Sequence, residues 1–125
     1  MKQEIKTSIH NRFDIYKTNR ETGKTEQIAY AENIVLDAMW PRLVNRLAYF
    51  GAIQFGTGTG TLVSSRTSLF SFLGAKTAID DVLTRTVPTA SWRRKIVLNP
   101  EDNIGAVLTE IGIGYDTTTG HLVTH

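Results

Sequence analysis

Few residues of this chain have the type and spacing that catalysis or metal binding requires. It contains no cysteine, which excludes disulfides, thiolate metal sites and cysteine nucleophiles. The histidines are His10, His121 and His125, and the last two are four residues apart in a predicted strand, where they do not converge as they would on a helix. No serine lies in a G-x-S-x-G frame. The sequence therefore predicts no catalytic residue and no metal site.

Carboxylates deserve separate attention, because glycoside hydrolysis uses a pair of them. The candidates are Asp80, Asp81, Glu101, Asp102 and Glu110. The first two are adjacent on a stretch expected to be exposed, and the next two lie in a predicted turn, so solvation explains both pairs. Glu110 interrupts the apolar run Val107–Ile113, where an unpaired carboxylate would be costly. We interpret Glu110 as a structural ion pair or hydrogen bond, with Arg94 or another nearby arginine, rather than as an acid catalyst.

Glycines at positions 56, 58 and 60 superficially resemble a nucleotide-binding loop. A dinucleotide fingerprint needs a glycine at its sixth position, which here is Thr61, and no long helix is predicted to follow. Gly74–Thr77 likewise lacks the adjacent glycine and lysine of a P-loop. The run therefore indicates an ordered structural loop in which glycine allows close backbone approach or positive φ, and no cofactor is expected.

Charge and hydropathy also favour neither nucleic acid nor membrane as a partner. The formal net charge is +2, from 14 basic and 12 acidic residues, which is not a strongly basic surface. Trp92–Lys95 contains three basic residues, but strand alternation places Arg93 and Lys95 on the face opposite Trp92 and Arg94. No stretch approaches the roughly 20 apolar residues of a membrane span, and the polar N-terminus lacks a signal sequence, so we expect synthesis in the cytoplasm.

The elements that would position these residues are mainly strands. At 125 residues, we expect residues 1–125 to form a single domain. Apolar residues alternate with polar ones over Ile5–Ile15 and again over Gln27–Ala31, with turn residues between, which predicts a half-buried β-hairpin.

The period then changes to that of a helix, with Asn33 as its N-cap. The apolar stripe contains Leu36, Met39, Trp40, Leu43, Val44 and Leu47. Pro41 lies inside it, so we expect a kink there or a helix that starts only one turn before Pro41.

The second half predicts more strands with less regular signals between them. Phe50–Phe55 alternates as a strand, Leu69–Gly74 could form a short helical turn, and residues 77–86 fit neither period. Trp92–Leu98 and Ile104–Gly114 flank turn residues and predict another hairpin. After a further turn, His121–His125 opens a strand with no closing signal, so we expect an open edge there and a natural chain that continues past it. The predicted fold is mainly β with one principal helix, an antiparallel sandwich-like or half-barrel sheet with the helix on one face.

The order of these segments resembles a family of bacteriophage tail-fibre or baseplate-associated structural proteins. The resemblance is carried by Ala31–Val35 before the helix, Ile53–Gly60 with Ser65–Phe70 after it, and Leu108–Ile113. It implies a virion component without a cofactor, commonly trimeric, and an N-terminal attachment domain of a longer chain.

The sequence thus predicts a non-enzymatic part of a tail fibre, collar or baseplate, located in the virion. It would assemble with itself, as a trimer by preference, and with other virion structural proteins. One alternative is a module that binds carbohydrate of the host cell surface, with Trp92, Tyr49 or Tyr115 as a stacking platform. A second alternative is a small glycan-cleaving enzyme centred on Glu110.

Overall fold

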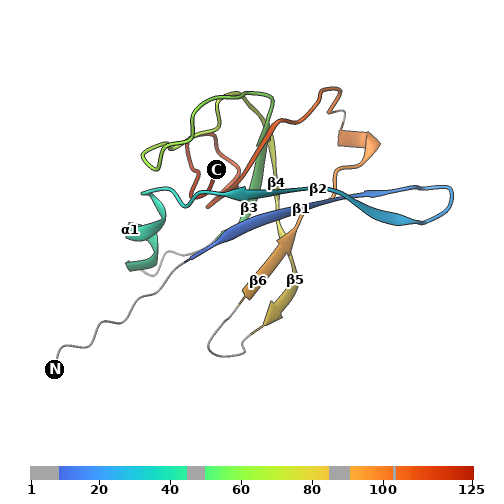
Figure 1. Ribbon diagram of the computed structural model, residues 1–125, viewed down its shortest axis with the longest axis horizontal. Coiled ribbons are helices and arrows are strands. Elements are labelled where there is room, and N and C mark those ends of the chain that lie inside the picture. The colour runs from blue at the N-terminus through green and yellow to red at the C-terminus, as the bar shows by residue number, and fades with distance from the viewer. Residues whose placement is uncertain (1–8, 45–49, 85–90, 103) are drawn as a thin grey trace.

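The computed structural model describes residues 9–44, 50–84, 91–102 and 104–125. In chain order the elements are β1 (Asn11–Thr18), β2 (Thr25–Asn33), α1 (Met39–Val44), β3 (Ala52–Gly56), β4 (Phe72–Thr77), β5 (Ile79–Thr84), β6 (Ser91–Lys95), the 3-10 turn η1 (Pro100–Asp102) and β7 (Glu110–Gly114). The described strands form three antiparallel sheets, β1-β2, β4-β3-β7 and β5-β6, and do not close into a barrel (Figure 1). The prediction of a mainly β fold with one helix is confirmed.

The three-stranded sheet is centred on β3, whose five residues are all buried. Gln54 in its middle is 0% exposed, and a buried amide is costly unless it is hydrogen-bonded. Its Nε2 lies 3.2, 2.9 and 3.3 Å from the carbonyl oxygens of Asp116, Thr118 and His121. The side chain of Gln54 therefore holds the turn that follows β7 against the central strand.

The C-terminal segment, residues 121–125, is the most enclosed part of the chain. Leu122 and Val123 are each 0% exposed, and Leu122 packs with Leu36 and Leu69 in the hydrophobic core. On one side, Ile34 and His125 exchange two backbone hydrogen bonds of 3.0 Å each. On the other, the amide of Val123 donates to the carbonyl of Ile113 at 2.8 Å. The expected open C-terminal edge is therefore wrong, because neighbouring segments hydrogen-bond to both sides of this strand.

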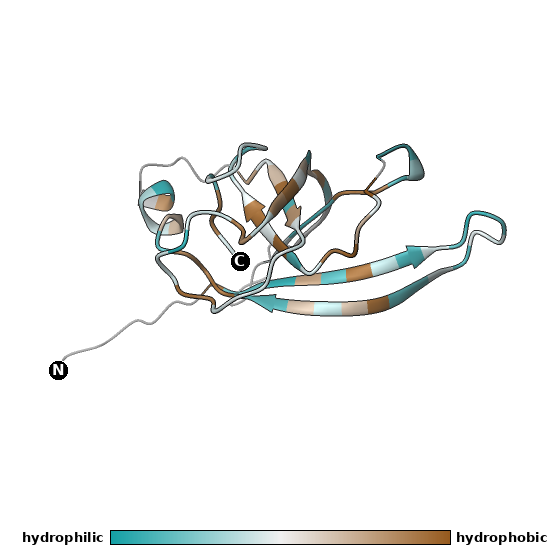
Figure 2. Ribbon diagram, turned by 90° about the horizontal axis from the view of Figure 1, so that it is seen from above, coloured by the Kyte–Doolittle hydropathy of each residue, from teal (hydrophilic) through white to brown (hydrophobic). Residues whose placement is uncertain are grey.

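The first hairpin, residues 11–33, extends away from the rest of the chain, and we call it the arm (Figures 1 and 2). The predicted hairpin is confirmed, with a bulge where Ile15 pairs with Ala29 but Tyr16 pairs with Gln27. The expectation of half-buried strands is wrong, because partial burial is confined to four residues near the base: Asn11, Phe13, Ala31 and Asn33. Packing on this chain's own core therefore does not account for the alternation in the outer part of the arm.

Few contacts join the arm to the other elements. At its base the side-chain amide of Asn33 donates to the carbonyl of Ile111 at 2.8 Å. At its tip Arg20 lies 3.5 Å from the side chain of Asn99 and 3.7 Å from that of Glu101. The Arg20–Glu101 pair is exposed, and such pairs contribute little stability.

A second hairpin, β5-β6, is attached mainly through Arg94. Its guanidinium donates to the carbonyl of Phe50 and, at 2.8 Å, to that of Ala78. Asp80 binds the same guanidinium at 3.1 Å and accepts the indole N–H of Trp92 at 2.8 Å. Asp80 is thus a structural carboxylate as well as a solvated one.

The principal helix is shorter than the periodicity predicts. It begins at Met39, whereas Asn33 is the last residue of β2 and Leu36 lies in an extended segment that hydrogen-bonds to Val123. Pro41 lies in the first turn of α1, where a backbone N–H has no hydrogen-bond partner within the helix. Proline therefore fits at this position without a kink. Trp40 is 49% exposed and does not belong to a buried stripe. Leu47 lies outside the described residues.

Strand pairing in the second half also differs from the prediction. The predicted helical turn over Leu69–Gly74 is wrong, because this segment enters β4. β6 pairs with β5, and β7 pairs with β3, so the predicted hairpin between them does not form. β7 pairs with β3, which lies far away in the chain, and β6 pairs with β5, whose sequence has no clear period. Local sequence patterns therefore do not predict either pairing.

Burial of the C-terminal segment can be tested by cavity formation. We expect Leu122→Ala to lower the free energy of unfolding by about 2–5 kcal/mol, because the fully buried side chain leaves a cavity. Leu62→Ala is the matched control, since Leu62 is 41% exposed and its truncation should change stability by about 0.5 kcal/mol or less. Urea unfolding measures both. Equal effects would contradict the burial of the C-terminal segment.

Candidate functional site

The carboxylate of Glu110, at the start of β7, joins four segments of the chain. Its Oε1 accepts hydrogen bonds from the backbone amides of Gly58, at 3.0 Å, and Ser71, at 2.7 Å. Its Oε2 accepts from the amide of Phe70 at 2.8 Å and contacts Nε2 of His125 at 3.0 Å. The side chains of Glu110 and His125 are only 4% and 3% exposed. Four partners match the roughly four acceptor positions of an ionised carboxylate, so the buried charge is fully satisfied.

The ring of His125 completes this cluster from the C-terminal segment. Because an ionised carboxylate only accepts hydrogen bonds, Nε2 of His125 is the donor in this pair. The ring lies 5.1 Å from that of Phe70, whose other neighbour is the guanidinium of Arg66 at 3.6 Å. His125 therefore ties the last residue of the sequence to the loop before β4.

The glycines of the Gly56–Gly60 run are explained by this carboxylate and its neighbours. A Cβ on Gly56 would lie 2.5 Å from Oε1 of Glu110, and one on Gly58 would lie 2.5 Å from Cβ of Phe70. Neither glycine is among those with positive φ, which are Gly23, Gly105 and Gly120 in the described residues. The prediction of an ordered loop that needs close backbone approach agrees with this geometry, and the loop presents no phosphate-binding helix.

The pKa of Glu110 reflects two opposing effects. Burial, the largest single influence, raises it, while the hydrogen bonds from Ser71, Phe70, Gly58 and His125 lower it. The hydrogen bonds together prevail, so the pKa of Glu110 is below its ordinary value. A group shifted in this direction is ionised near neutral pH and acts as an acceptor, which does not suit a general acid.

A second polar cluster follows β7 and was not predicted from the sequence. The guanidinium of Arg42 lies 3.6 Å from the ring centre of Tyr115, and the ring of His121 stacks on Tyr115 at 4.6 Å. Nδ1 of His121 lies 2.8 Å from Oδ2 of Asp116, and this hydrogen bond is the main cause of a lowered pKa for Asp116. Tyr115 is half-buried and its ring contacts both Arg42 and His121, so it is less accessible than the exposed stacking platform that the carbohydrate-binding alternative requires.

The structure separates most of the residues singled out in the sequence. His121 and His125 contact different carboxylates, as their spacing on a strand predicts. The predicted partnership of Glu110 with Arg94 is wrong, because Arg94 binds at the base of β5-β6 instead. Backbone amides are the partners of Glu110, and sequence patterns give no signal for those. Trp92 and Arg94 lie on one face, with the guanidinium 5.1 Å from the indole, as alternation predicts.

Apolar side chains are distributed unusually over the described residues. Nine hydrophobic residues are buried, two of them alanines, whereas fifteen large hydrophobic residues are exposed. The arm contributes Ile15, Tyr16, Ile28 and Tyr30 to the exposed set, at 37%, 54%, 57% and 62%. Single exposed apolar residues are ordinary, whereas a concentration of them on one element is a candidate interaction surface.

The described residues hold no group of three or more histidine or acidic side chains placed to bind a metal ion. Nor does any described helix have the length and apolar character to cross a membrane. No family model, no curated protein and no solved structure matches this chain. The candidate functional surfaces are therefore those defined by geometry, and the arm is foremost among them.

Replacement of Glu110 tests whether its carboxylate is structural. Glu110→Gln keeps the shape but puts an NH2 group against amide donors, so we expect a loss of about 1–3 kcal/mol or more in the free energy of unfolding. Glu101→Gln is the control, because the Glu101 side chain is 73% exposed. Equal denaturation midpoints for the two variants would contradict the assignment.

The pH dependence of stability has a defined sign. Because the folded-state pKa of Glu110 is lowered, its contribution is present above the unfolded pKa of about 4.3 and is lost as pH falls through the folded pKa. We expect unfolding free energy to fall with acidification in this range, and less steeply in Glu110→Gln. Asp102 and Asp116, whose pKa values are also lowered, add to the slope in both proteins. Identical slopes would contradict the prediction.

Proposed function

We propose that this chain is a non-enzymatic structural component of a bacteriophage particle, in a tail fibre, collar or baseplate. It would assemble with copies of itself and with neighbouring virion proteins. The arm is the observation that carries the proposal, because it projects from the fold and leaves its apolar side chains exposed.

An isolated two-stranded hairpin is marginally stable in water, and the arm gains few contacts from the rest of the chain. Beyond its hydrogen-bonded base, the arm would therefore be held more firmly by a partner. Tyr16 and Tyr30 share one face with Arg12, whose guanidinium lies 4.4 Å from the ring of Tyr30. Tyrosine and arginine are enriched in protein interfaces, and hairpin edges can accept a further strand from another protein.

The Glu110 cluster supports a structural role over a catalytic one. Its carboxylate is buried, hydrogen-bonded at both oxygens and shifted toward the ionised form. A glycosidase acid needs access to the glycosidic oxygen and a raised pKa. The geometry of Glu110 therefore supports a structural role, in which its carboxylate joins several segments of the chain, over a role as a catalytic acid.

The copy number and place of the chain follow from the resemblance rather than from geometry. We propose a homo-oligomer, with three copies favoured, that forms part of the virion and anchors a receptor-binding fibre. The arm would be the surface through which each copy reaches its neighbour. Four of the fifteen exposed large hydrophobic residues lie in the arm, and the others lie elsewhere on the described chain.

The carbohydrate-binding alternative depends on Trp92. Tyr49 lies outside the described residues, and the Tyr115 ring contacts both Arg42 and His121. Trp92 is 44% exposed, and its ring contacts Arg94 and Phe50 at centroid distances of 5.1 and 6.0 Å, so only the exposed part of the indole could stack on a sugar. Its hydrogen bond to Asp80 fixes its orientation.

Substitutions in the arm test the proposed function. We expect Tyr16→Glu combined with Tyr30→Glu to reduce incorporation into phage particles at least tenfold, because charges would replace the aromatic contact surface. Incorporation is measured by quantitative mass spectrometry of purified particles from a phage lacking its own copy, supplied with each variant. The fold should survive, since both side chains are exposed.

Two further variants make the result specific. Leu62→Glu, at an exposed apolar residue outside the arm, should incorporate normally. Trp92→Ala should also incorporate normally, and a loss of host-glycan binding in that variant would favour the carbohydrate alternative. Full incorporation of the doubly substituted arm would contradict the proposal.

A further inference from the structure

The two strands of the arm have outer edges that differ in charge. Among the described strands, β1 and β2 pair only with each other, so no further described strand lies beside either edge. β1 carries the basic residues Arg12 and Lys17, and charged residues of this kind on an edge strand oppose pairing with another strand. β2 contains no basic residue and no proline, and its charged residues are Glu26 and Glu32. The outer edge of β2 is therefore acidic and less protected.

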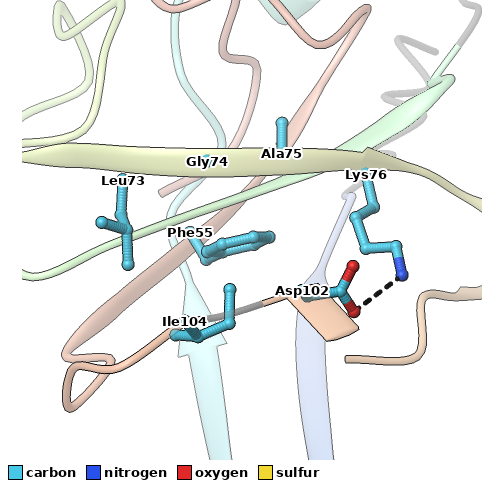
Figure 3. Close-up of a pocket in the computed structure, with 7 residues that line it drawn as sticks. All are labelled: Phe55, Leu73, Gly74, Ala75, Lys76, Asp102 and Ile104. Carbon is cyan, nitrogen blue, oxygen red and sulfur yellow. Dashed lines mark hydrogen bonds and ion pairs between the residues drawn. The ribbon is translucent and has the colours of Figure 1, made fainter. Parts of the chain in front are cut away.

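The hollow beneath β4 has no such excess of one charge (Figure 3). Its volume is about 240 Å³, and Figure 3 shows Phe55 and Ile104 in its apolar part. Its two charged residues, Lys76 and Asp102, form an ion pair of 3.1 Å at one end. The charges of the hollow therefore neutralise each other, whereas those of β2 do not.

The backbone of β2 faces outward at alternate residues. Across the arm, the amide of Asn19 donates to the carbonyl of Lys24 at 2.8 Å, so the odd-numbered residues of β1 hydrogen-bond to β2. The extra residue of the bulge lies in β2, and the alternation along β1 is therefore unbroken. Ala31 pairs with an odd-numbered residue of β1 and faces it. Tyr30 and Glu32, on either side of Ala31, therefore direct their N–H and C=O groups outward.

The same edge already holds a strand just beyond the base of the arm. Ile34 and Leu36 are the next residues that face outward, and they hydrogen-bond to His125 and Val123. The C-terminal segment is antiparallel to this part of the chain. A strand added beside β2 in the same orientation would therefore lie end to end with the C-terminal segment and run from the base of the arm toward its tip.

Residues 1–8 lie outside the described residues, but their types suit a strand on this edge. They contain neither proline nor glycine, and Ile5 begins the apolar alternation that continues into β1. Lys2 and Lys6 against Glu4 give these eight residues a net side-chain charge of +1, whereas the two glutamates of β2 give it a charge of −2. The segment and the edge are therefore complementary in charge.

A segment that begins where the C-terminal segment ends is aligned by this charge. Its Lys2 would lie opposite Glu32, whose partner on the other side is Arg12 in β1. The acidic side chain would then stand between two basic ones. Ile5 would lie opposite Ala29, so that an apolar pair follows the charged one. Opposite charges and apolar side chains that face each other across strands both stabilise a sheet.

The chain's own residues 1–8 cannot occupy this position. β1 begins with Asn11 at the base of the arm, whereas a segment of eight residues that runs from the base toward the tip would end about 20 Å along it. Three Cα–Cα steps join Ser8 to Asn11, and they span at most about 11 Å. A strand on this edge that has the sequence of residues 1–8 must therefore come from another copy.

We propose that residues 1–8 of one copy form a third strand on the outer edge of β2 of a neighbouring copy, antiparallel to β2. The inference rests on the proposed assembly of copies through the arm and names the segment that the arm receives. Addition of a strand to an exposed edge is a common mode of peptide recognition. Because donor and acceptor are different surfaces, the contact is heterologous, and contacts of this type can close a ring of three copies.

Native mass spectrometry of the full chain and of a chain that lacks residues 2–8 tests the contact. We expect the full chain to form an assembly of three copies and the shortened chain to be monomeric, because the donated strand is missing. A shortened chain with the same assembly mass as the full chain, or a full chain that is monomeric, would overturn the proposal.

Charge reversal tests the alignment without shortening the chain. We expect Glu32→Lys to raise the concentration of half-assembly at least tenfold, because three basic side chains would then stand in one row. Glu21→Lys is the matched control, since Glu21 is exposed in the turn at the tip of the arm, and it should leave assembly unchanged. Lys2→Glu combined with Glu32→Lys should restore assembly to within about threefold of the unsubstituted chain. Equal effects of the two single reversals would contradict the contact.

Photo-cross-linking shows whether the donor is another copy. Tyr30 is replaced by p-benzoyl-phenylalanine, and chains with light and heavy isotopes are mixed in denaturant and refolded together. We expect cross-links from position 30 to residues 1–8 that join light to heavy chains. Cross-links to residues 1–8 that never join the two isotope forms would overturn the proposal.

Incorporation into phage particles separates this inference from the proposed function. A chain without residues 2–8 that still assembles and enters particles would overturn the strand contact and leave the proposed function standing. A full chain that assembles through residues 1–8 but is absent from particles would support the strand contact and contradict the proposed place in the virion.

Discussion

The buried charge of Glu110 is the constraint on which the rest of this fold depends. A carboxylate that is 4% exposed must be matched by donors, since an unmatched one would cost several kcal/mol. Three backbone amides and His125 provide that match, and each comes from a segment that forms no regular strand at that point. One side chain thereby fixes the Gly56–Gly60 loop, the approach to β4 and the C-terminal segment. The small space around it explains why glycine stands at positions 56 and 58.

A polar centre of this kind leaves a small apolar core. The cluster of buried hydrophobic residues consists of Leu36, Leu69 and Leu122, with Ile34 packed against it. Hydrogen bonds and close backbone packing therefore define the centre, while many large apolar side chains lie on projecting elements. Burial of the exposed apolar side chains in a complex would add to the stability of such a fold, because removal of apolar surface from water is favourable.

Local sequence patterns predicted the positions of the strands better than they predicted which strands pair with each other. Alternation over the first hairpin located β1 and β2, because a hairpin needs only neighbouring residues and a turn. The helical period of the apolar residues from Leu36 onward wrongly placed Asn33 and Leu36 in a helix. Asn33 ends β2, and Leu36 hydrogen-bonds to Val123, a contact with a distant segment that the period does not indicate. Glu110 was identified as buried from its apolar neighbours, but its partners were not. Every residue except proline has a backbone amide, so residue types do not indicate which distant loops donate to Glu110. The pairing of β7 with β3 likewise joins segments that are far apart in the sequence.

The arm and the Glu110 cluster are parts of one hydrogen-bonded path. β2 ends at Asn33, which bonds to the carbonyl of Ile111 in β7, and the next residue, Ile34, exchanges two hydrogen bonds with His125. His125 in turn bonds to Glu110, one residue before Ile111. A force applied to the arm therefore reaches the centre of the fold through several hydrogen bonds within a few residues, rather than through a single flexible joint. Because those bonds are at least partly buried, they hold the base of the arm in a fixed orientation relative to the central sheet.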